Sequence, residues 1–502
     1  MVVSITAEQE YLAKACQEIL RAFYPGEGIQ INEENSVITL ELEKNKSHIK
    51  VKAIGQGKVF QASDRLGISS EAENTARRLA RLVVLRCLED ITGRSIGPWG
   101  ILTGIRPTKI VHRIMDRGLP QGEIINQLTA DYALVEAKAR LLTEVCTLQR
   151  GFLHSPEKAG GLISIYIGIP FCPTRCVYCS FPAYSTDRHG HLVEPFLQAL
   201  QKEISALGQG IKGLGLEVET VYIGGGTPTS LNEGQLAGLL EAVTGNLVSG
   251  QTREFTLEAG RPDSINMDKL QLMKRAGVNR ISINPQSMNM ETLRTIGRSH
   301  SPEEIRAAFT LAKESGFDNI NMDIIVGLPG ETLEHINRTL SQIAGLGPDN
   351  LTVHTLALKR ASRLKEEQRI RDIKGDNQET QDQNVIVTTD VVAEMLARCY
   401  EGAKGMGMHP YYLYRQKQML GHLENVGFAQ QGKDCIYNIQ MMEERQTVVG
   451  LGAGAGSKWV DPKDWTLLNT YNPKDPQNYI ERVEEMVNFK LEKLNYSSRS
   501  KS

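Results

Sequence analysis

The residues of this sequence best suited to chemistry are three cysteines in one short stretch, Cys172, Cys176 and Cys179. The C-x3-C-x2-C spacing lets a single loop turn all three sulfurs onto one centre. Three thiolates are one ligand too few for a closed four-cysteine site, and an iron–sulfur cluster held in this way keeps one iron open. The spacing therefore predicts a [4Fe–4S] cluster with an open coordination position.

Soft thiolates also bind zinc, which would need a fourth ligand, and His189 or His191 could supply it. Structural zinc sites usually combine two close pairs of ligands, which this spacing does not match, so the cluster is favoured. The other cysteines are scattered singly: Cys16, Cys87, Cys146, Cys399 and Cys435. Scattered cysteines in so long a chain predict reduced thiols rather than a disulfide framework.

The second feature is the turn 224–228, Gly-Gly-Gly-Thr-Pro, which follows an apolar, β-branched run. A glycine triplet alone more often marks a tight turn than a ligand site. Glu258 and Gln286 follow later apolar runs in the same way, and Asp323 lies within one. Polar and glycine-rich residues thus gather where predicted strands end, which is where barrel enzymes build their active sites.

The elements that must position these residues alternate regularly between residues 160 and 365. Apolar, β-branched runs cover residues 163–167, 219–223, 254–257, 280–283, 319–326 and 350–356. Helical patterns separate them at residues 191–207, 233–243, 267–276, 302–316 and 333–344. This alternation predicts parallel βα units in an α/β fold, either a partial (β/α)6 barrel or an open doubly wound sheet. The polar residues after several strand ends favour the partial, TIM-like barrel.

Residues 1–155 are predicted to form an added N-terminal α+β domain of unknown role. Helical periodicity covers residues 6–23, with Thr6 as the N-cap, while residues 36–42 and 48–53 alternate like strands. The Gly- and Pro-rich stretch 93–109 is loop-like, and its segment 103–109 either faces a ligand or the next domain or is a structural loop.

Residues 366–502 are predicted to form a third, mainly helical region, which begins with a charged and polar stretch. The run 450–457 nearly matches a dinucleotide fingerprint, but no βαβ unit with an acidic ribose partner follows it. We therefore interpret its glycines as positions of close backbone packing.

C-x3-C-x2-C after the first βα strand resembles the radical SAM superfamily. The resemblance implies that S-adenosyl-L-methionine (SAM) chelates the open iron. One electron from the reduced cluster then cleaves SAM into methionine and a 5′-deoxyadenosyl radical, which abstracts hydrogen from the substrate. The protein contributes positioning and exclusion of water, while the cofactors carry the chemistry.

The resemblance narrows to one family through several segments: 166–172, 222–229, Glu258, 286–287, 297–300 and 323–332. Together these segments resemble the oxygen-independent coproporphyrinogen III oxidase (dehydrogenase) family, over about residues 160 to 460. The N-terminal domain and the segments 258–263 and 424–427 resemble its HemZ-like branch. The resemblance also implies that residues 366–502 form a coproporphyrinogen-dehydrogenase-like region.

Carried over to this sequence, the cluster ligands of the family are the three cysteines, and its SAM contacts are Tyr166, Gly225, Gly226, Thr227, Glu258, Gln286, Arg298, Asp323 and Ala357. A carboxylate of Glu258 or Asp323 can accept hydrogen bonds from ribose hydroxyls, and Arg298 can pair with a carboxylate. Arg298 as a helix-end salt bridge and Tyr166 as a core residue remain structural alternatives.

The implied reaction is the oxidative decarboxylation of coproporphyrinogen III to protoporphyrinogen IX in porphyrin and haem biosynthesis, with two SAM consumed per porphyrinogen. The resemblance also implies a flavodoxin- or ferredoxin-type electron donor. One position departs from the dehydrogenase pattern: Phe181 stands where those enzymes have a further cysteine, two residues after the third cluster cysteine. Phenylalanine there resembles the haem-chaperone branch, so a chaperone that binds haem without decarboxylation is the alternative.

A substrate with four propionates needs cations, and Lys359, Arg360 and Arg363 follow the sixth predicted strand. Arg415 and Lys417 are further candidates, with solvated surface charge as the alternative for all five. Cys435, close to Tyr437 in sequence, is a candidate redox or hydrogen-donating group if it is not a core residue.

Composition excludes several classes of function. The formal net charge of −2 gives no global basic field for nucleic acid. No apolar run approaches the length of a membrane span, and the N-terminus lacks the blocks of a signal peptide. We therefore expect a cytoplasmic protein with no membrane span and no nucleic-acid partner.

Overall fold

We describe a computed structural model of the chain over residues 2–24, 27–31, 37–45, 48–65, 72–104, 106–181, 183–357, 387–416 and 419–499. The chain divides into two compact units, Met1–Cys146 and Thr147–Ser502. The predicted boundary after residue 365 lies outside the described residues and stays a prediction. No helix in the described ranges is long and apolar enough to cross a membrane.

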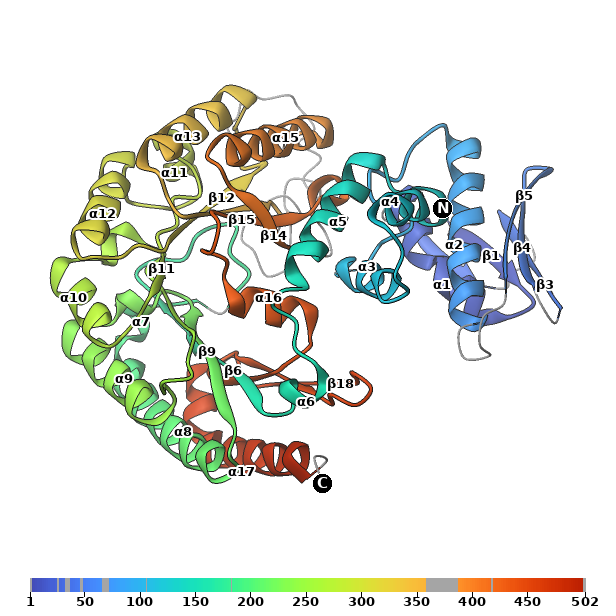
Figure 1. Cartoon of the computed structure of the whole chain (residues 1–502). Helices are drawn as coiled ribbons and strands as arrows, with labels where there is room; N and C mark the ends of the chain where they lie inside the picture. Colours follow the sequence, from blue (N-terminus) through green and yellow to red (C-terminus); the bar gives the residue numbers. More distant parts are fainter. Residues whose placement is uncertain are drawn as a thin grey trace. The chain divides into compact units, whose positions relative to one another are not determined.

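The first unit is built on a five-stranded sheet of order β2-β1-β3-β4-β5 (Figure 1). Its strands are β1 Val2–Ala7, β2 Gly28–Ile31, β3 Ile38–Lys44, β4 His48–Gly55 and β5 Lys58–Arg65. Its helices are α1 Glu10–Phe23, α2 Ala72–Thr92, α3 Thr108–Met115 and α4 Gln121–Tyr132, followed by α5 Glu136–Gln149. Side chains of β4 alternate between buried and less buried, so one face of the sheet packs against α1 and α2.

The predicted N-cap at Thr6 is wrong. Thr6 lies in β1 and is paired with Thr39 of β3, and Gln9 precedes the first residue of α1. Because β1 lies between two parallel neighbours, pairing within the sheet overrides the helical pattern before Gln9.

The second unit is built on one sheet of order β14-β15-β13-β12-β11-β10-β9-β6-β16-β17-β18. Its central strands are all parallel to their neighbours: β6 Leu162–Ile169, β9 Glu217–Gly225, β10 Glu254–Glu258, β11 Arg280–Ser282, β12 Ile320–Val326 and β13 Asn350–Thr355. These strands follow one another in chain order, whereas a doubly wound sheet reverses its order at a switch point. The partial (β/α)6 barrel is confirmed.

Helices on the outer side of this sheet complete the βα units, and Figure 1 shows them in chain order around the curve. They are α8 Val193–Gly213, α9 Glu233–Asn246, α10 Met267–Arg275, α12 Pro302–Glu314 and α13 Leu333–Leu346. Three shorter helices are α6 Pro156–Ala159, which precedes β6, α7 Thr186–His189 and α11 Met290–Thr295. Capping boxes begin α9, at Asn232 and Gln235, and α12, at Ser301 and Glu304.

The C-terminal residues contain strands as well as the expected helices. The helices are α15 Thr389–Gly405, α16 Ile436–Glu443 and α17 Pro476–Arg499, and the strands are β14 His409–Tyr414, β15 Asn425–Ala429, β16 Thr447–Gly452, β17 Gly456–Val460 and β18 Leu467–Tyr471. β16 pairs in parallel with β6, and β15 pairs antiparallel with β13. These strands therefore satisfy the backbone of both edges of the central sheet.

The glycine run at residues 450–457 forms the closely packed end of β16, as predicted. A Cβ atom at Gly450 would lie 2.5 Å from the carbonyl oxygen of Gly456, and one at Gly452 would lie 2.3 Å from that of Gly168. The run thus allows β16 to approach β17 and β6 rather than to cradle a dinucleotide.

Candidate active site

The three predicted cluster cysteines border one small cavity of about 80 Å³. Cys172 ends the short strand β7 Phe171–Cys172, which pairs with β8 Tyr184–Ser185. Cys176 and Cys179 follow in the loop, where the amide of Cys179 donates to the carbonyl of Cys176 at 3.2 Å. The loop is thereby folded so that all three side chains reach the same cavity.

These residues fit an iron–sulfur cluster. Burial raises the pKa of Cys172 to about 11, so a bound metal is needed to hold its thiolate. A Cβ atom at Gly226 would come within 2.9 Å of the Cys172 sulfur and 2.5 Å of the Phe171 carbonyl oxygen, so only glycine leaves the thiol accessible. In the described ranges no three His, Cys, Asp or Glu side chains, these cysteines included, are grouped closely enough to hold a single metal ion, so the three thiols suit a larger cluster rather than one ion.

The zinc alternative lacks its fourth ligand. Neither His189 nor His191 is among the described residues that line the cysteine cavity. His189 instead contacts the carbonyl of Ser185 at 3.2 Å through Nδ1 and packs edge-on against Tyr184.

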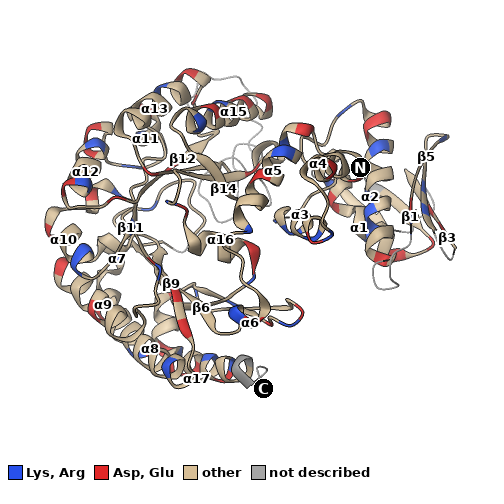
Figure 2. Cartoon of the chain, in the orientation of Figure 1, with Lys and Arg blue, Asp and Glu red and all other residues tan. Residues whose placement is uncertain are grey.

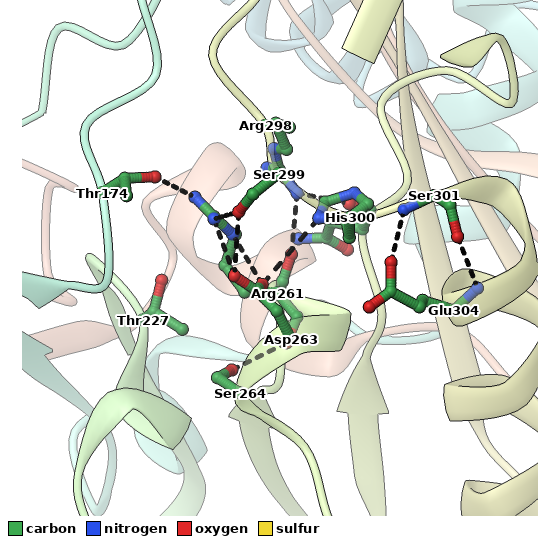
Figure 3. A network of polar contacts seen from close by, with 12 residues as sticks. Thr174, Thr227, Arg261, Asp263, Ser264, Arg298, Ser299, His300, Ser301 and Glu304 are labelled. Carbon is green, nitrogen blue, oxygen red and sulfur yellow. Dashed lines mark hydrogen bonds and ion pairs between the residues drawn. The ribbon is translucent and has the colours of Figure 1, made fainter. Parts of the chain in front are cut away.

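A buried arginine ties the cysteine loop to the ends of the neighbouring strands (Figure 3). Two nitrogens of Arg261 donate to the two carboxylate oxygens of Asp263 at 3.0 and 2.9 Å. Nη1 also donates to the Thr174 hydroxyl at 3.1 Å and lies 3.9 Å from the Cys176 sulfur. Burial alone would raise the pKa of Asp263, but the His300 ring, 3.8 Å away, and the hydrogen bonds from Arg261 hold it well below its usual range. A positive charge is thus fixed beside one cluster thiol.

A larger cavity of about 360 Å³ adjoins the cysteine cavity, since Cys179, Gly225 and Arg298 line both. The predicted SAM contacts that line it are Tyr166, Gly225, Gly226, Glu258, Gln286, Arg298, Asp323 and Ala357. Thr227 lines the smaller cavity, where its hydroxyl lies 3.5 Å from the Cys172 sulfur. The fold therefore brings all nine predicted contacts to two adjoining cavities.

Two carboxyl groups in the larger cavity, Glu258 and Asp323, have pKa values that are shifted in opposite directions. Burial, reinforced by the charge of Asp323, raises the pKa of Glu258 to about 7, although the hydroxyl of Tyr222 donates to it at 2.7 Å. Burial also acts on Asp323, but His354 at 3.7 Å and the amide of Asn321 at 2.7 Å keep its pKa below the usual value. Asp323 is thus the fixed anion, and Glu258 is the group that titrates near neutral pH.

Arg298 is held by neutral acceptors rather than by a carboxylate. Its Nη1 donates to the carbonyl oxygens of Gly260 at 3.1 Å and Asn284 at 2.8 Å, and its Nη2 donates to the Tyr178 hydroxyl at 3.2 Å. These contacts exclude the simple helix-end salt bridge. Its positive charge therefore stays available to an anionic group in the cavities that it lines.

Gln286 has a left-handed backbone, with φ of +66°, which is uncommon for a residue other than glycine. Its amide donates to the carbonyl of Asp323 at 2.9 Å, and its carbonyl accepts from the amide of Ile325 at 3.0 Å. Neighbouring strand β12 therefore fixes this strained residue at the cavity wall.

Tyr166 is part of an aromatic cluster with Tyr222 and Tyr437. The ring centroids of Tyr222 and Tyr437 are 4.6 Å apart, and Tyr166 lies 6.1 Å from each. Tyr166 is more than a core residue, because it lines the larger cavity as well as packing in this cluster. Sequence reasoning did not identify Tyr222, although it precedes the glycine turn by only two residues.

Of the five cationic residues predicted to bind the substrate, only Arg415 lies within the described residues. Lys359, Arg360, Arg363 and Lys417 lie outside the described residues. Arg415 lies within them but is buried; its Nη2 donates to the carbonyl of His422 at 2.6 Å, and the described residues that line the larger cavity do not include it. Its role in the described structure is to hold the chain before β15.

Cys435 is fully buried, and its sulfur lies 3.2 Å from a carboxylate oxygen of Glu254. It lines none of the cavities described above, whereas Tyr437 borders a third cavity that adjoins the larger one through Tyr166 and Glu258. Phe181, the departure from the dehydrogenase pattern, lines the larger cavity with a side chain that is 60% exposed.

Comparisons with known proteins agree with this geometry. The sequence profile of the Radical SAM superfamily matches residues 166–343. The chain is 38% identical over 464 residues to the oxygen-independent coproporphyrinogen-III oxidase-like protein HemZ of Bacillus subtilis, covering 91% of this chain and 90% of HemZ. It is 37% identical over 201 residues to the heme chaperone HemW of the same organism, covering 39% of this chain and 51% of HemW.

Among solved structures, the chain is similar to coproporphyrinogen III oxidase (HemN) of Escherichia coli, described as a radical SAM enzyme. The TM-score is 0.51 and the sequence identity 25%, over 68% of this chain and 72% of HemN.

Proposed function

The chain belongs to the radical SAM superfamily and, within it, to the family of oxygen-independent coproporphyrinogen III oxidase-like proteins that includes HemZ, and we propose that it decarboxylates coproporphyrinogen III oxidatively to protoporphyrinogen IX. The superfamily uses a [4Fe–4S] cluster and SAM, which are the cofactors of this chain. When bound, the reduced cluster cleaves SAM and so supplies the radical that removes hydrogen from the substrate.

The observation that carries the radical SAM part of the proposal is the continuity of the cysteine cavity with the larger cavity through Cys179, Gly225 and Arg298. A cofactor that spans the two would have one end at the cluster and the other among Glu258 and Asp323. This arrangement matches the extended shape of SAM, which carries charged groups at its methionine end and hydroxyls on its ribose.

In this proposal Cys172, Cys176 and Cys179 hold the cluster. The turn at Gly225, Gly226 and Thr227 receives the methionine ammonium, and Arg298 pairs with the methionine carboxylate. Glu258 and Asp323 accept hydrogen bonds from the ribose hydroxyls, and Gln286 offers both a donor and an acceptor. Tyr166 and Ala357 complete the wall of the SAM site.

The aromatic wall of the larger cavity supports a macrocyclic substrate. Tyr412 and Tyr414 line it with rings that are nearly parallel, at 12°, and 6.1 Å apart. Such faces can pack against pyrrole rings. The electron donor in this proposal is a flavodoxin- or ferredoxin-type protein, and the reaction takes place in the cytoplasm.

A second candidate is a haem chaperone that binds haem without decarboxylation. The observation that favours it is Phe181, because an exposed aromatic side chain at the cavity offers a contact for a porphyrin and no thiol for the reaction. The similarity to the heme chaperone HemW over 201 residues supports this candidate as well.

One anaerobic assay separates the two candidates. Reconstituted protein is incubated with SAM, a reductant and coproporphyrinogen III, and the tetrapyrroles are resolved by chromatography. Protoporphyrinogen IX formed together with 5′-deoxyadenosine supports the enzyme. Tight haem binding with no decarboxylation would overturn the first proposal and favour the chaperone. The Cys176→Ala variant controls for decarboxylation that does not need the cluster.

A further inference from the structure

The unit Met1–Cys146 has a cavity of its own, of about 520 Å³, with a strongly basic lining. Six arginines line it: Arg65, Arg77, Arg78, Arg81, Arg113 and Arg117. They come from the end of β5, from α2, and from α3 together with the residues just after it. Basic segments of α2 and α3 are blue in Figure 2. We call this cavity the arginine cavity.

The positive charge of the arginine cavity is only partly neutralised. Its one described acidic residue, Asp64, pairs with Arg78, which also pairs with Asp131 outside the cavity, and Arg77 pairs with Glu73 outside it. By contrast, the guanidinium groups of Arg113 and Arg117 form no ion pair with any residue that the structure describes. An anionic ligand would supply the missing partners.

Two more residues add to this excess of charge. Arg65 is exposed and has no ion-pair partner in the described part of the chain. The Nε of Arg81 donates to the neutral carbonyl of Ala15 at 2.9 Å, which leaves its charge uncompensated. The unpaired arginines therefore lie on β5, on α2, and on or just after α3. Because they lie on different elements, they can bind a ligand at more than one of the ligand's edges.

The choice of arginine over lysine indicates planar anionic groups. Residues 1–146 contain 11 Arg and 8 Lys, yet none of the lysines lines the arginine cavity. The guanidinium fork binds a carboxylate or phosphate through two parallel hydrogen bonds, which an ammonium group cannot do. The whole stretch has 19 Lys and Arg against 18 Asp and Glu, so it lacks the broad basic field of a nucleic-acid surface.

The rest of the lining is apolar. Ile101, Leu102, Ile110 and Ile114 contribute aliphatic side chains, and Tyr132 contributes an aromatic ring. Leu102 and Ile110 directly precede and follow the segment 103–109, for which facing a ligand or the next domain was one interpretation. An inorganic anion would not use this surface, and a nucleotide carries its charges at one end only. The aliphatic residues of the lining and the arginines, which come from different elements, together fit a flat apolar ligand with carboxylates at several of its edges.

We propose that the arginine cavity is a tetrapyrrole site, which binds the propionates of a porphyrin or porphyrinogen and packs its ring against the aliphatic residues. The choice of a tetrapyrrole rests on the proposed function, whereas the preference for an apolar polycarboxylate follows from the arginine cavity itself. The site would hold the substrate or product of the second unit without taking part in the reaction.

The test measures binding of coproporphyrin III, the stable oxidised form of the proposed substrate, to the full-length chain. The variant R113Q/R117Q removes two exposed arginines of the arginine cavity. The matched control R86Q/R140Q removes the same charge from exposed positions of α2 and α5 outside it. We expect the affinity of R113Q/R117Q to fall about tenfold, since two solvent-exposed charge contacts are lost, each weaker than a buried one, and that of R86Q/R140Q to stay unchanged.

A second readout locates the bound porphyrin. Of the three tryptophans, Trp99 lies two residues before Ile101 of the arginine cavity, whereas Trp459 and Trp465 belong to the second unit. In a W459F/W465F background, coproporphyrin III should quench Trp99 emission, and R113Q/R117Q should weaken that quenching. This separates binding in the first unit from binding in the barrel.

The binding and quenching measurements test the tetrapyrrole site separately from the proposed enzymatic function. Equal affinity and equal quenching in R113Q/R117Q and its control would overturn it, even if decarboxylation is observed. Binding that depends on Arg113 and Arg117, without any protoporphyrinogen formed, would keep the site and defeat the proposed enzyme. If the chain did not bind coproporphyrin III but bound a single-stranded RNA through these arginines, the tetrapyrrole assignment would also be overturned.

Discussion

The hydroxyl of Tyr222 donates a hydrogen bond of 2.7 Å to Oε1 of Glu258 in the larger cavity of the barrel. Burial raises the pKa of Glu258 to about 7, and the Tyr222 bond works against that rise. The carboxylate that is proposed to accept from the SAM ribose is therefore only partly ionised at neutral pH. This pair links the protonation of the site to cofactor binding.

The affinity of the cluster-loaded protein for SAM should fall as the pH is lowered through about 7, because Glu258 takes up a proton and can no longer accept two hydrogen bonds. The limiting slope is about tenfold per pH unit for one proton. Equilibrium dialysis of SAM between pH 6 and 8.5 measures it. Tyr222→Phe removes a donor that lowers the pKa, so its midpoint should move to higher pH.

The controls for this pH dependence lie in the same cluster. Glu258→Gln should bind SAM more weakly but without the pH dependence. Tyr437→Phe keeps the ring that packs 4.6 Å from Tyr222 and leaves the bond to Glu258 in place, so its midpoint should match the parent. An unchanged midpoint in Tyr222→Phe would show that Glu258 is not the titrating group.

Replacing Cys172, Cys176 or Cys179 with alanine should each time remove the cluster, because two thiolates cannot hold it. Iron content and visible absorbance after anaerobic reconstitution measure the loss. Cys399→Ala is the control, since Cys399 is buried in α15 and does not line the cysteine cavity. If iron stayed at the parental level in all three variants, the cluster assignment would be wrong.

Gly226→Ala should impair the cluster site although it changes no ligand. The added Cβ would meet the Phe171 carbonyl oxygen at 2.5 Å and the Cys172 sulfur at 2.9 Å, and the backbone oxygen cannot move aside cheaply. Lower iron incorporation and weaker SAM binding are the expected results. Gly234→Ala in α9 is the control, because the nearest atom to its Cβ is 3.6 Å away.

Local patterns in the sequence predicted the barrel because its central strands are short, apolar and separated by amphipathic helices. The chemistry-bearing residues at strand ends, such as Glu258 and Gln286, followed from the same alternation. The network of Arg261 could not be predicted, since it joins the cysteine loop to residues 85 or more positions away. The strand β15 was also missed, because Asn425 and Gly427 weaken its strand pattern although pairing with β13 stabilises it.

Arg261→Gln should lower the reduction potential of the cluster without preventing its assembly. The guanidinium lies 3.9 Å from the Cys176 sulfur, and donors near cluster sulfurs raise the potential. A charge-assisted hydrogen bond contributes about 1.5–3 kcal/mol, so a fall of about 65–130 mV is expected for a one-electron couple. Redox titration followed by electron paramagnetic resonance measures it.

Two controls accompany the Arg261 variant. Arg261→Lys keeps a positive charge near the thiol and should restore most of the potential. Ser299→Ala removes a polar neighbour of Arg261 that does not contact the cysteines, and should leave the potential unchanged. An unaltered potential in Arg261→Gln would mean that this arginine only fixes Asp263 and the loop.

Lys490 of α17 should be essential to the stability of the barrel rather than to its chemistry. Its ammonium pairs with the fully buried Glu203 of α8 and donates to the carbonyl of Gly450 in β16 at 2.6 Å. Lys490→Met would leave the Glu203 charge buried without its partner, at a cost of about 3–5 kcal/mol. Urea unfolding followed by tryptophan emission should show the lower midpoint.

The double variant Glu203→Gln/Lys490→Met distinguishes loss of a charge partner from loss of packing. Glu203 also accepts from the Tyr479 hydroxyl at 2.6 Å and the Gly452 amide at 2.9 Å, and glutamine can keep these contacts without a buried charge. The double variant should therefore recover most of the stability lost in Lys490→Met. Arg482→Met, on an exposed part of α17, should change the midpoint little. If the double variant were as unstable as Lys490→Met, the aliphatic packing of Lys490 would be what holds α17 to the barrel.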